Sequence, residues 1–331
     1  MSDSEKVSAE VRNRIAPTLL KVSNAGLRAW LKTLGLPSPA VASKPLLTDL
    51  IAKLIVEGEL SEPSLEQALI GFEEASGKRI YLFDLEDLPS ESPDKWLPGR
   101  FSALSIPLSI KRIFTSSKSK PMSAVYGEIN GNWIRIKWTE VQHCATINPK
   151  TDKVDLSPVD KTIVLIADLK AHTAELRLDP PENRHSYDDV LGQSTADAYY
   201  NAYMQRCKDV LGCTFNKTEL RQVIQKLVEE VDPRVVRIHI DHHTNQKNTK
   251  FKTTSSRADV RDDEDWKNNY ETYGAKWAWD FQSFYWLPKP SAGSLKRELF
   301  SHIDAVEGFV KVNADCSNEE VEYAISQVRA R

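Results

Sequence analysis

The hydrophobic pattern of this chain changes its period near Gly77, and that change limits the folds open to it. Before Gly77 the apolar residues recur every three to four positions, as on one face of an amphipathic helix. After Gly77 they mostly alternate with polar residues, beginning with RIYLFDL at 79–85, as in strands with one buried face. Helices followed by strands with inserted helices are typical of the α+β class. We therefore predict a small N-terminal helical bundle, followed by a larger, mixed and mostly antiparallel β domain.

Four short helices are expected in the first 75 residues. Residues that commonly cap helices mark the starts of three of them, Asn24, Ser43 and Ser61. Gly35 and Gly58 mark two of the ends, because glycine readily adopts the left-handed conformation that closes a helix. The short links between these helices predict a compact bundle.

A β-hairpin is the clearest local feature of the remaining chain. The alternating runs 122–129 and 132–138 are separated by Asn130–Gly131, the dipeptide that most strongly favours a tight hairpin turn. Further strands are predicted at 162–168, 173–178, 234–243, 275–287 and near 306–313, and helices at about 195–211 and 217–230. The predicted organisation is a helical, DNA-binding domain at 1–77, a strand with a Ser/Pro/Lys-rich connecting segment at 78–121, and an α+β, partner-binding domain at 122–331.

The net charge of −3 hides two basic stretches on either side of an acidic one. Residues 1–56 carry eight basic and four acidic side chains, and residues 57–94 carry eleven acidic and two basic ones. Residues 95–138 carry eight basic side chains and a single acidic one, Glu128. Such an excess of positive charge repels itself, so we expect a polyanion or an acidic partner to neutralise it.

Composition and motifs exclude several classes of protein. No apolar run reaches the roughly 18 residues that a membrane-spanning helix needs, and the polar start lacks the apolar stretch of a signal peptide. There is no P-loop, dinucleotide-binding, HExxH or GxSxG motif. The cysteines form no C-x-x-C pair, which favours reduced thiols: Cys144, Cys207, Cys213 and Cys316. We expect an intracellular protein with no bound cofactor and no membrane partner.

Two leucine-rich helices with a connecting loop, residues 27–54, carry a recognisable pattern. Its members are Leu31, Leu34, Gly35, Leu36 and Pro37, then Asp49, Leu50, Ile51, Lys53 and Leu54. The pattern resembles the SAP motif, which implies that basic side chains and helix N-termini face DNA phosphates. The loop at 38–45 is longer than in the motif and has only Lys44 in place of the usual glycine and lysine. The leucines could equally form the core of an ordinary helical hairpin.

Five short motifs follow one another between residues 20 and 140. They are L-x-x-W at 27–30, an apolar helix ending at Glu57–Gly58, RIYLFDLEDL at 79–88, KWLP at 95–98 and NWIRIKW at 132–138. Their order is similar to the CENP-N family of kinetochore proteins. The resemblance implies a pyrin-like helical domain, a β-rich C-terminal part and binding to DNA and nucleosomes. It also implies a nuclear location, in place of a cytoplasmic one, and a related partner bound through the C-terminal half.

Three residues of the predicted strand 234–243 suggest a metal site. His239, Asp241 and His243 alternate, so they would point to one face, where two imidazoles and a carboxylate could hold a divalent ion. Their spacing of about 6.5–7 Å is wide for one ion. The alternative is a strand that ends in a polar loop.

Aromatic residues lie beside basic ones in two places. In 132–138 the alternation puts Trp133, Arg135 and Lys137 on one face, which we predict to point outward. The run 277–286 could be a stacking platform for bases or an aromatic sheet core. The predicted nucleic-acid contacts are Lys21, Arg28, Lys32, Lys44, Lys53, Lys111, Arg112, Lys118, Lys120, Trp133, Arg135 and Lys137.

The sequence favours a non-catalytic protein that binds double-stranded DNA or chromatin through phosphates, with a protein partner on its C-terminal domain. Lysine and arginine would neutralise phosphates and release counterions, which gives salt-sensitive binding with little base readout. Two alternatives stay open. One is a metal-dependent nuclease or hydrolase that uses His239, Asp241 and His243. The other is an adaptor that binds proteins only.

Overall fold

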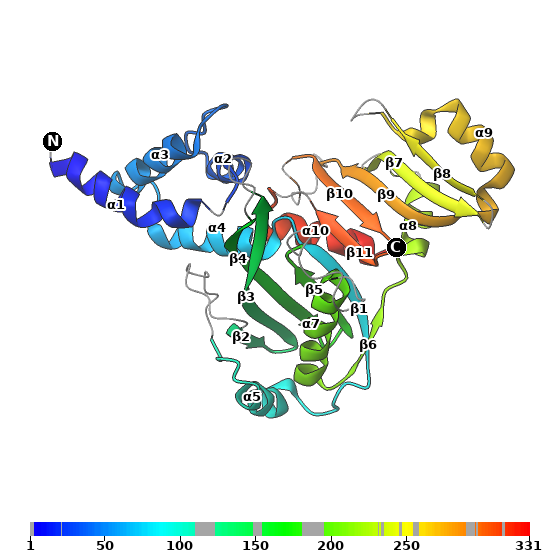
Figure 1. Cartoon of the computed structure of the whole chain (residues 1–331), viewed down its shortest axis with the longest axis horizontal. Helices are drawn as coiled ribbons and strands as arrows, with labels where there is room; N and C mark the ends of the chain where they lie inside the picture. Colours follow the sequence, from blue (N-terminus) through cyan, green and yellow to red (C-terminus); the bar gives the residue numbers. More distant parts are fainter. Residues whose placement is uncertain are drawn as a thin grey trace.

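The computed structural model describes residues 3–20, 22–109, 123–147, 154–180, 195–230, 232, 235–244, 247–253, 258–288, 295, 297–312 and 315–331. It confirms the α+β class, because four N-terminal helices precede one large antiparallel sheet with further helices inserted between its strands. The four N-terminal helices lie at one end of the molecule, beside the sheet (Figure 1). Within the described segments, no helix is long and apolar enough to cross a membrane.

The N-terminal bundle contains α1 (Asp3–Leu19), α2 (Asn24–Thr33), α3 (Lys44–Val56) and α4 (Glu62–Ala75). Ser43 and Ser61 cap α3 and α4 as predicted, each accepting a hydrogen bond from a backbone N–H of the first turn. The predicted cap of α2 is displaced by one residue, since Ser23, not Asn24, accepts the bond from the N–H of Gly26. The core consists of fully buried side chains, among them Leu19, Leu27, Leu31, Leu47 and Ile51.

In the part of the chain that the structure describes, the sheet has eleven strands, paired in the order β2-β3-β4-β5-β1-β11-β10-β9-β7-β8, with β6 added beside β1. All its strand pairs are antiparallel. The strands are β1 (Arg79–Glu86), β2 (Ser123–Asn130), β3 (Trp133–Ile147), β4 (Val154–Asp168), β5 (Thr173–Leu178), β6 (Thr214–Lys217), β7 (Val235–Thr244), β8 (Lys247–Lys252), β9 (Ala278–Trp286), β10 (Leu299–Asp304) and β11 (Phe309–Val312). The predicted hairpin is β2–β3, and Gly131 in its turn has φ of 59°.

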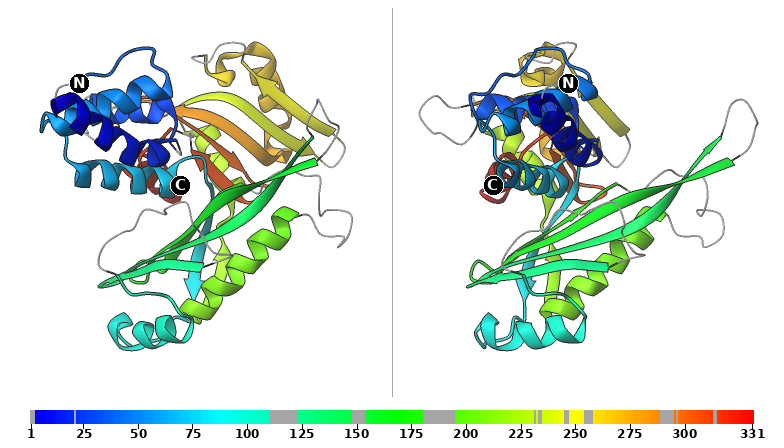
Figure 2. Two further views of the ribbon diagram at one scale, coloured as in Figure 1. Left: turned by 60° about the vertical axis from the view of Figure 1, so that its left-hand side comes forward. Right: turned by 90° about the vertical axis from the view of Figure 1, so that its left-hand side faces the viewer.

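Helices cover opposite faces of the two halves of the sheet. On one face, over β1 and β3–β5, α5 (Pro93–Ala103) and α7 (Thr195–Leu211) bury an apolar cluster that includes Trp138. On the other face, over β7 and β9–β11, the cluster is buried by α8 (Leu220–Glu229), α9 (Glu264–Tyr273) and α10 (Asn318–Arg329). Figure 2 shows the long β3–β4 ribbon projecting beyond these helices.

Several predicted boundaries are wrong because tertiary contacts outweigh local signals. The segment 86–121 was expected to be a connecting loop but contains α5, whose Leu97 and Phe101 are fully buried. Strand β4 begins well before residue 162, despite Pro158, which pairs opposite His143. The lysine-rich β8 was not predicted from the sequence, although lysine is common on edge strands, where it hinders further pairing.

A buried ionic network joins the end of α4 to the sheet. Glu74 is fully buried; it accepts hydrogen bonds from the hydroxyl of Tyr126 (2.6 Å) and from Nη1 of Arg135 (2.6 Å). Its neighbour Glu73 pairs with Lys137, which is also fully buried. Because an unpaired buried charge is very costly, these partners define where α4 can lie on β2 and β3.

Lys78, just after α4, extends this network. Its ammonium lies 2.6 Å from the carboxylate of Asp179 and donates to the carbonyl of Thr162 (3.2 Å). Burial lowers the pKa of Lys78, and the nearby Asp179 carboxylate opposes that shift. The residues immediately before β1 are thus tied to β4 and to the end of β5.

We expect Glu74→Ala to destabilise the protein by about 3 to 5 kcal/mol, since it leaves Arg135 and Tyr126 buried without their carboxylate. Glu74→Gln keeps a hydrogen-bond acceptor for the hydroxyl of Tyr126 and should therefore lose less stability. The control is Asp49→Ala, which removes the exposed Arg12–Asp49 pair (2.6 Å) and should cost less than about 1 kcal/mol. Urea denaturation measures all three, and equal small losses for Glu74→Ala and Asp49→Ala would contradict a structural role for the network.

Candidate nucleic-acid interface

The α2–α3 hairpin, residues 24–56, is held together by polar contacts to its long loop as well as by its leucine core. Arg28 donates from Nε to the carbonyl of Asn24 (3.2 Å) and from Nη1 to the carbonyl of Ala40. The ammonium of Lys44 donates to the carbonyl of Val22. Two of the predicted phosphate contacts therefore also position the loop that distinguishes this hairpin from the SAP motif.

Three cations of this hairpin have no acidic partner in the described residues. No described carboxylate forms an ion pair with Arg28, Lys32 or Lys44. Arg28 and Lys44 donate to backbone carbonyls, which carry no net charge, so their positive charges stay uncompensated. Burial lowers the pKa of Lys44, a shift that a bound phosphate would oppose. Lys53 has only an exposed partner, Glu57, at 3.6 Å, and such pairs contribute little.

Carboxylates limit the basic surface on two sides. On the neighbouring α1, Arg12 pairs with Asp49 and Arg14 with Glu62. On the other side, Lys32 opens onto a groove of about 870 Å³ between the bundle and the start of α10. The opposite wall of the groove carries three acidic residues, Asp315, Glu319 and Glu320, and one base, Arg297, which pairs with Glu320 at 2.7 Å. A polyanion is therefore favoured along the edge formed by α2 and the start of α3, and disfavoured inside the groove.

The predicted basic face of the 132–138 strand is corrected by the structure. Trp133 is 55% exposed, but Arg135 and Lys137 are 7% and 0% exposed because the end of α4 covers them. They cannot contact phosphates while they pair with Glu74 and Glu73. Five other predicted contacts, Lys21, Lys111, Arg112, Lys118 and Lys120, lie outside the described residues.

Sequence reasoning did not single out Glu73 and Glu74, although a signal was present. The acidic excess of residues 57–94 comes directly before the basic excess of 95–138, and two of its glutamates neutralise two of those cations. The expected acidic partner of Arg135 and Lys137 is thus a helix of the same chain.

The predicted metal-ligating residues separate into two pairs. Nε2 of His239 lies 2.6 Å from Oδ1 of Asp241, whereas Nδ1 of His243 contacts Asp280 of β9. An irregularity in the β7–β9 pairing between Asp241 and His242 accounts for the divergence. Among the described side chains no group of three His, Cys, Asp or Glu could hold a metal ion.

The aromatic run 277–286 contributes to the sheet core. Trp277, Trp279, Phe284 and Trp286 are all less than 10% exposed, so they offer no stacking platform for bases. His242 is buried among these rings and stacks on Trp277, with 3.5 Å between ring centroids. Burial lowers the pKa of His242 to about 4.

We predict that this buried imidazole makes the protein less stable in mild acid. The folded-state pKa is depressed, so the unfolded chain takes up the proton first as the pH falls below the ordinary value of 6.5. Because of His242, the free energy of unfolding should fall by about 2 to 3 kcal/mol as the pH is lowered from 7 to 4.5. His242→Phe should remove that part of the pH dependence, as measured by urea denaturation at several pH values. Parallel curves for the two proteins would contradict the prediction.

In comparisons with known proteins, no family model and no curated protein matches this chain. The similarities to the SAP motif and to the CENP-N family therefore stay predictions.

Proposed function

We propose that this protein binds double-stranded DNA or chromatin without catalysing a reaction, and that the α2–α3 hairpin is its main contact surface. The observation that carries this proposal is that Arg28, Lys32 and Lys44 have no acidic partner among the described residues. Cations that neutralise phosphates release counterions, which drives binding with little dependence on base sequence.

Two side chains of the hairpin, Arg28 and Lys44, are already held in position for such contacts. Arg28 uses two of its five N–H donors for backbone carbonyls, and Lys44 uses one of three, so both retain donors for phosphate oxygens. Their present bonds hold the side chains in place before DNA arrives, which reduces the conformational entropy lost on binding.

Exposed apolar side chains on the same hairpin favour chromatin over bare DNA. Leu34, Val41 and Leu46 are 45%, 92% and 60% exposed, although each is large and apolar. Phosphates offer such side chains nothing to pack against, whereas a protein bound to the DNA would cover them.

Reversing three charges tests the DNA contact. We expect Arg28→Glu, Lys32→Glu and Lys44→Glu together to weaken binding to a labelled duplex and to reduce its salt dependence. Each lost phosphate contact lowers the slope of log K against log salt by about 0.9, so the slope should fall by about 2 to 3. Fluorescence anisotropy at several salt concentrations measures both effects.

The matched control reverses three exposed lysines at the far end of the molecule, Lys252, Lys267 and Lys276. It changes the net charge equally, but α9 and its surroundings lie far from α2 and α3 (Figure 1). An equal loss in the control, or an unchanged slope in the hairpin variant, would contradict the proposal.

We also propose that the C-terminal half binds a protein partner through the open face of β7, β9 and β10, defined here by Phe281, Tyr285 and Phe300. Helices α8, α9 and α10 cover only the opposite face, and no described helix covers this one (Figure 1). These side chains are half-buried and packed in pairs, with 5.3 Å between the ring centroids of Tyr285 and Phe300. Phe281 also lies beside His302, at 5.3 Å.

A photo-crosslinking amino acid at Phe281 tests this surface. In cells that make the protein, we expect one recurring protein adduct from this position and none from the control, Tyr273, which is 53% exposed on α9. Tyr285→Lys should abolish the adduct, because a charge would disrupt the apolar contact. Equal adducts from both positions would contradict a specific partner at this face.

A further inference from the structure

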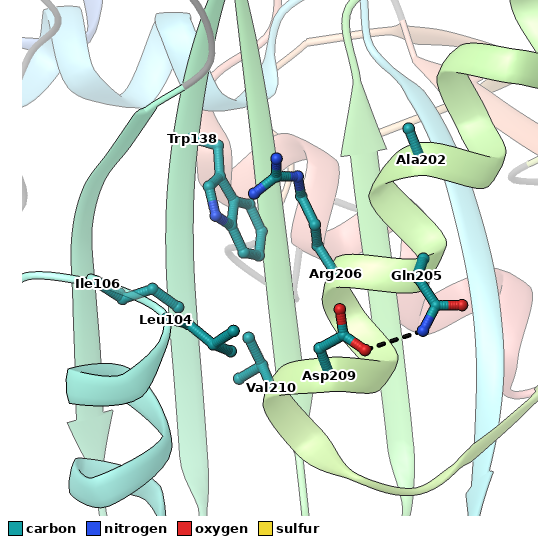
Figure 3. A pocket seen from close by; sticks show the side chains of 8 residues that line it. All are labelled: Leu104, Ile106, Trp138, Ala202, Gln205, Arg206, Asp209 and Val210. Carbon is teal, nitrogen blue, oxygen red and sulfur yellow. Dashed lines mark hydrogen bonds between the residues drawn. The ribbon is translucent and has the colours of Figure 1, made fainter.

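A pocket of about 400 Å³ lies between the end of α5, strand β3 and helix α7, on the face of the sheet opposite the ionic network. Trp138, Leu104, Ile106 and Val210 form its apolar walls, and Arg206 and Asp209 lie on its α7 side (Figure 3). We propose that this pocket binds a short segment of a protein partner, in which a large apolar side chain stands next to an acidic residue.

The walls of the pocket are held in place by close packing. The carbonyl of Pro107 accepts the N–H of Gly127 (2.7 Å), and the N–H of Ser109 donates back to the carbonyl of Gly127 (2.9 Å). A Cβ on Gly127 would lie 2.8 Å from Ile106, so only glycine allows this approach. The Ile106 wall is thus fixed to β2.

The α5 wall is fixed to α7 in a similar way. Nη1 of Arg100 donates to the carbonyl of Asp209 (3.1 Å), near the C-terminal end of α7, where a positive charge is favourable. The same guanidinium lies against Gly212, whose φ of 61° ends the helix turn. A pocket whose walls do not need to be ordered on binding loses less entropy when it is filled.

The size and lining of the pocket suit an apolar side chain. A volume of 400 Å³ is at the lower end of the range for ligand pockets, roughly 300–1,000 Å³, which fits one large side chain and part of its neighbours. Trp138 is 2% exposed and Leu104 41%, so an incoming side chain would cover mainly Leu104 at the edge of the buried cluster.

The charges at the pocket define the rest of the ligand. Arg206 is exposed and forms no ion pair with a described carboxylate, and Figure 3 shows its guanidinium beside Trp138. A planar guanidinium binds a carboxylate through two parallel hydrogen bonds. Asp209, held by Nε2 of Gln205 (2.8 Å), lies nearer Val210 and would repel a second carboxylate. The acidic residue of the ligand is therefore directed to the Trp138 end, and peptide N–H groups to the Asp209 end.

The experiment selects peptides from a displayed random library on the full-length protein and counter-selects on Ala202→Trp. Ala202 lines the pocket and is exposed on α7, so tryptophan fills the space without disturbing the core. We expect the peptides lost on Ala202→Trp to combine an aromatic or large aliphatic residue with an adjacent Asp or Glu. Recovery of no such pocket-dependent peptide, or only of peptides without an acidic residue, would overturn the proposal.

A recovered peptide, labelled for fluorescence anisotropy, then tests the charge. Arg206→Glu should weaken binding about tenfold or more, and Arg206→Lys by less, because lysine keeps the charge but loses the paired hydrogen bonds. Lys208→Glu is the control, since it makes the same change in charge on the same helix outside the pocket lining. Equal effects of Arg206→Glu and Lys208→Glu would overturn the role of Arg206. DNA binding by Ala202→Trp should be unchanged, which separates this site from the hairpin.

Discussion

Two adjacent glutamates at the end of α4 determine how the helical bundle meets the sheet. Glu74 accepts hydrogen bonds from both the Tyr126 hydroxyl and the Arg135 guanidinium, while Glu73 pairs with Lys137. Charges this deeply buried are tolerated only when their partners are in place, so the bundle cannot slide or rotate on β2 and β3 without breaking several contacts at once. The direction in which α2 and α3 present their cations depends on this junction.

These contacts between the end of α4 and the sheet also explain part of the charge pattern along the chain. A basic stretch suggests a polyanion, but part of this one is neutralised by the acidic helix that precedes it. Two cations are thereby removed from any phosphate-binding surface, whereas Arg28, Lys32 and Lys44 of the α2–α3 hairpin form no ion pair with a described carboxylate. The excess of positive charge in one stretch of the sequence predicted that its basic residues have acidic partners. Only the fold shows that some of these partners lie in the same chain.

The three proposed sites lie on different parts of the molecule. The basic hairpin is at one end, the open face of β7, β9 and β10 is in the other half of the sheet, and the α5–α7 pocket lies below the first half (Figure 1). None of the residues named for one site lines another. Among the described residues, the two histidines of the predicted metal site contact different carboxylates, His239 that of Asp241 and His243 that of Asp280.

Features that depend on neighbouring residues could be predicted from the sequence. Helix caps at Ser43 and Ser61, the Asn130–Gly131 turn and the order of helices before strands follow from local hydrogen bonding and hydrophobic period. The placement of Arg28, Lys32 and Lys44 on one helical hairpin also follows from the sequence, whereas their contact with phosphates stays a proposal. The structure was needed to show that 93–103 is a helix, that Arg135 and Lys137 are buried, and that His243 pairs with Asp280 of β9. Each of these depends on residues far away in the chain, and no local pattern records which distant side chain will cover a strand or pair with a charge.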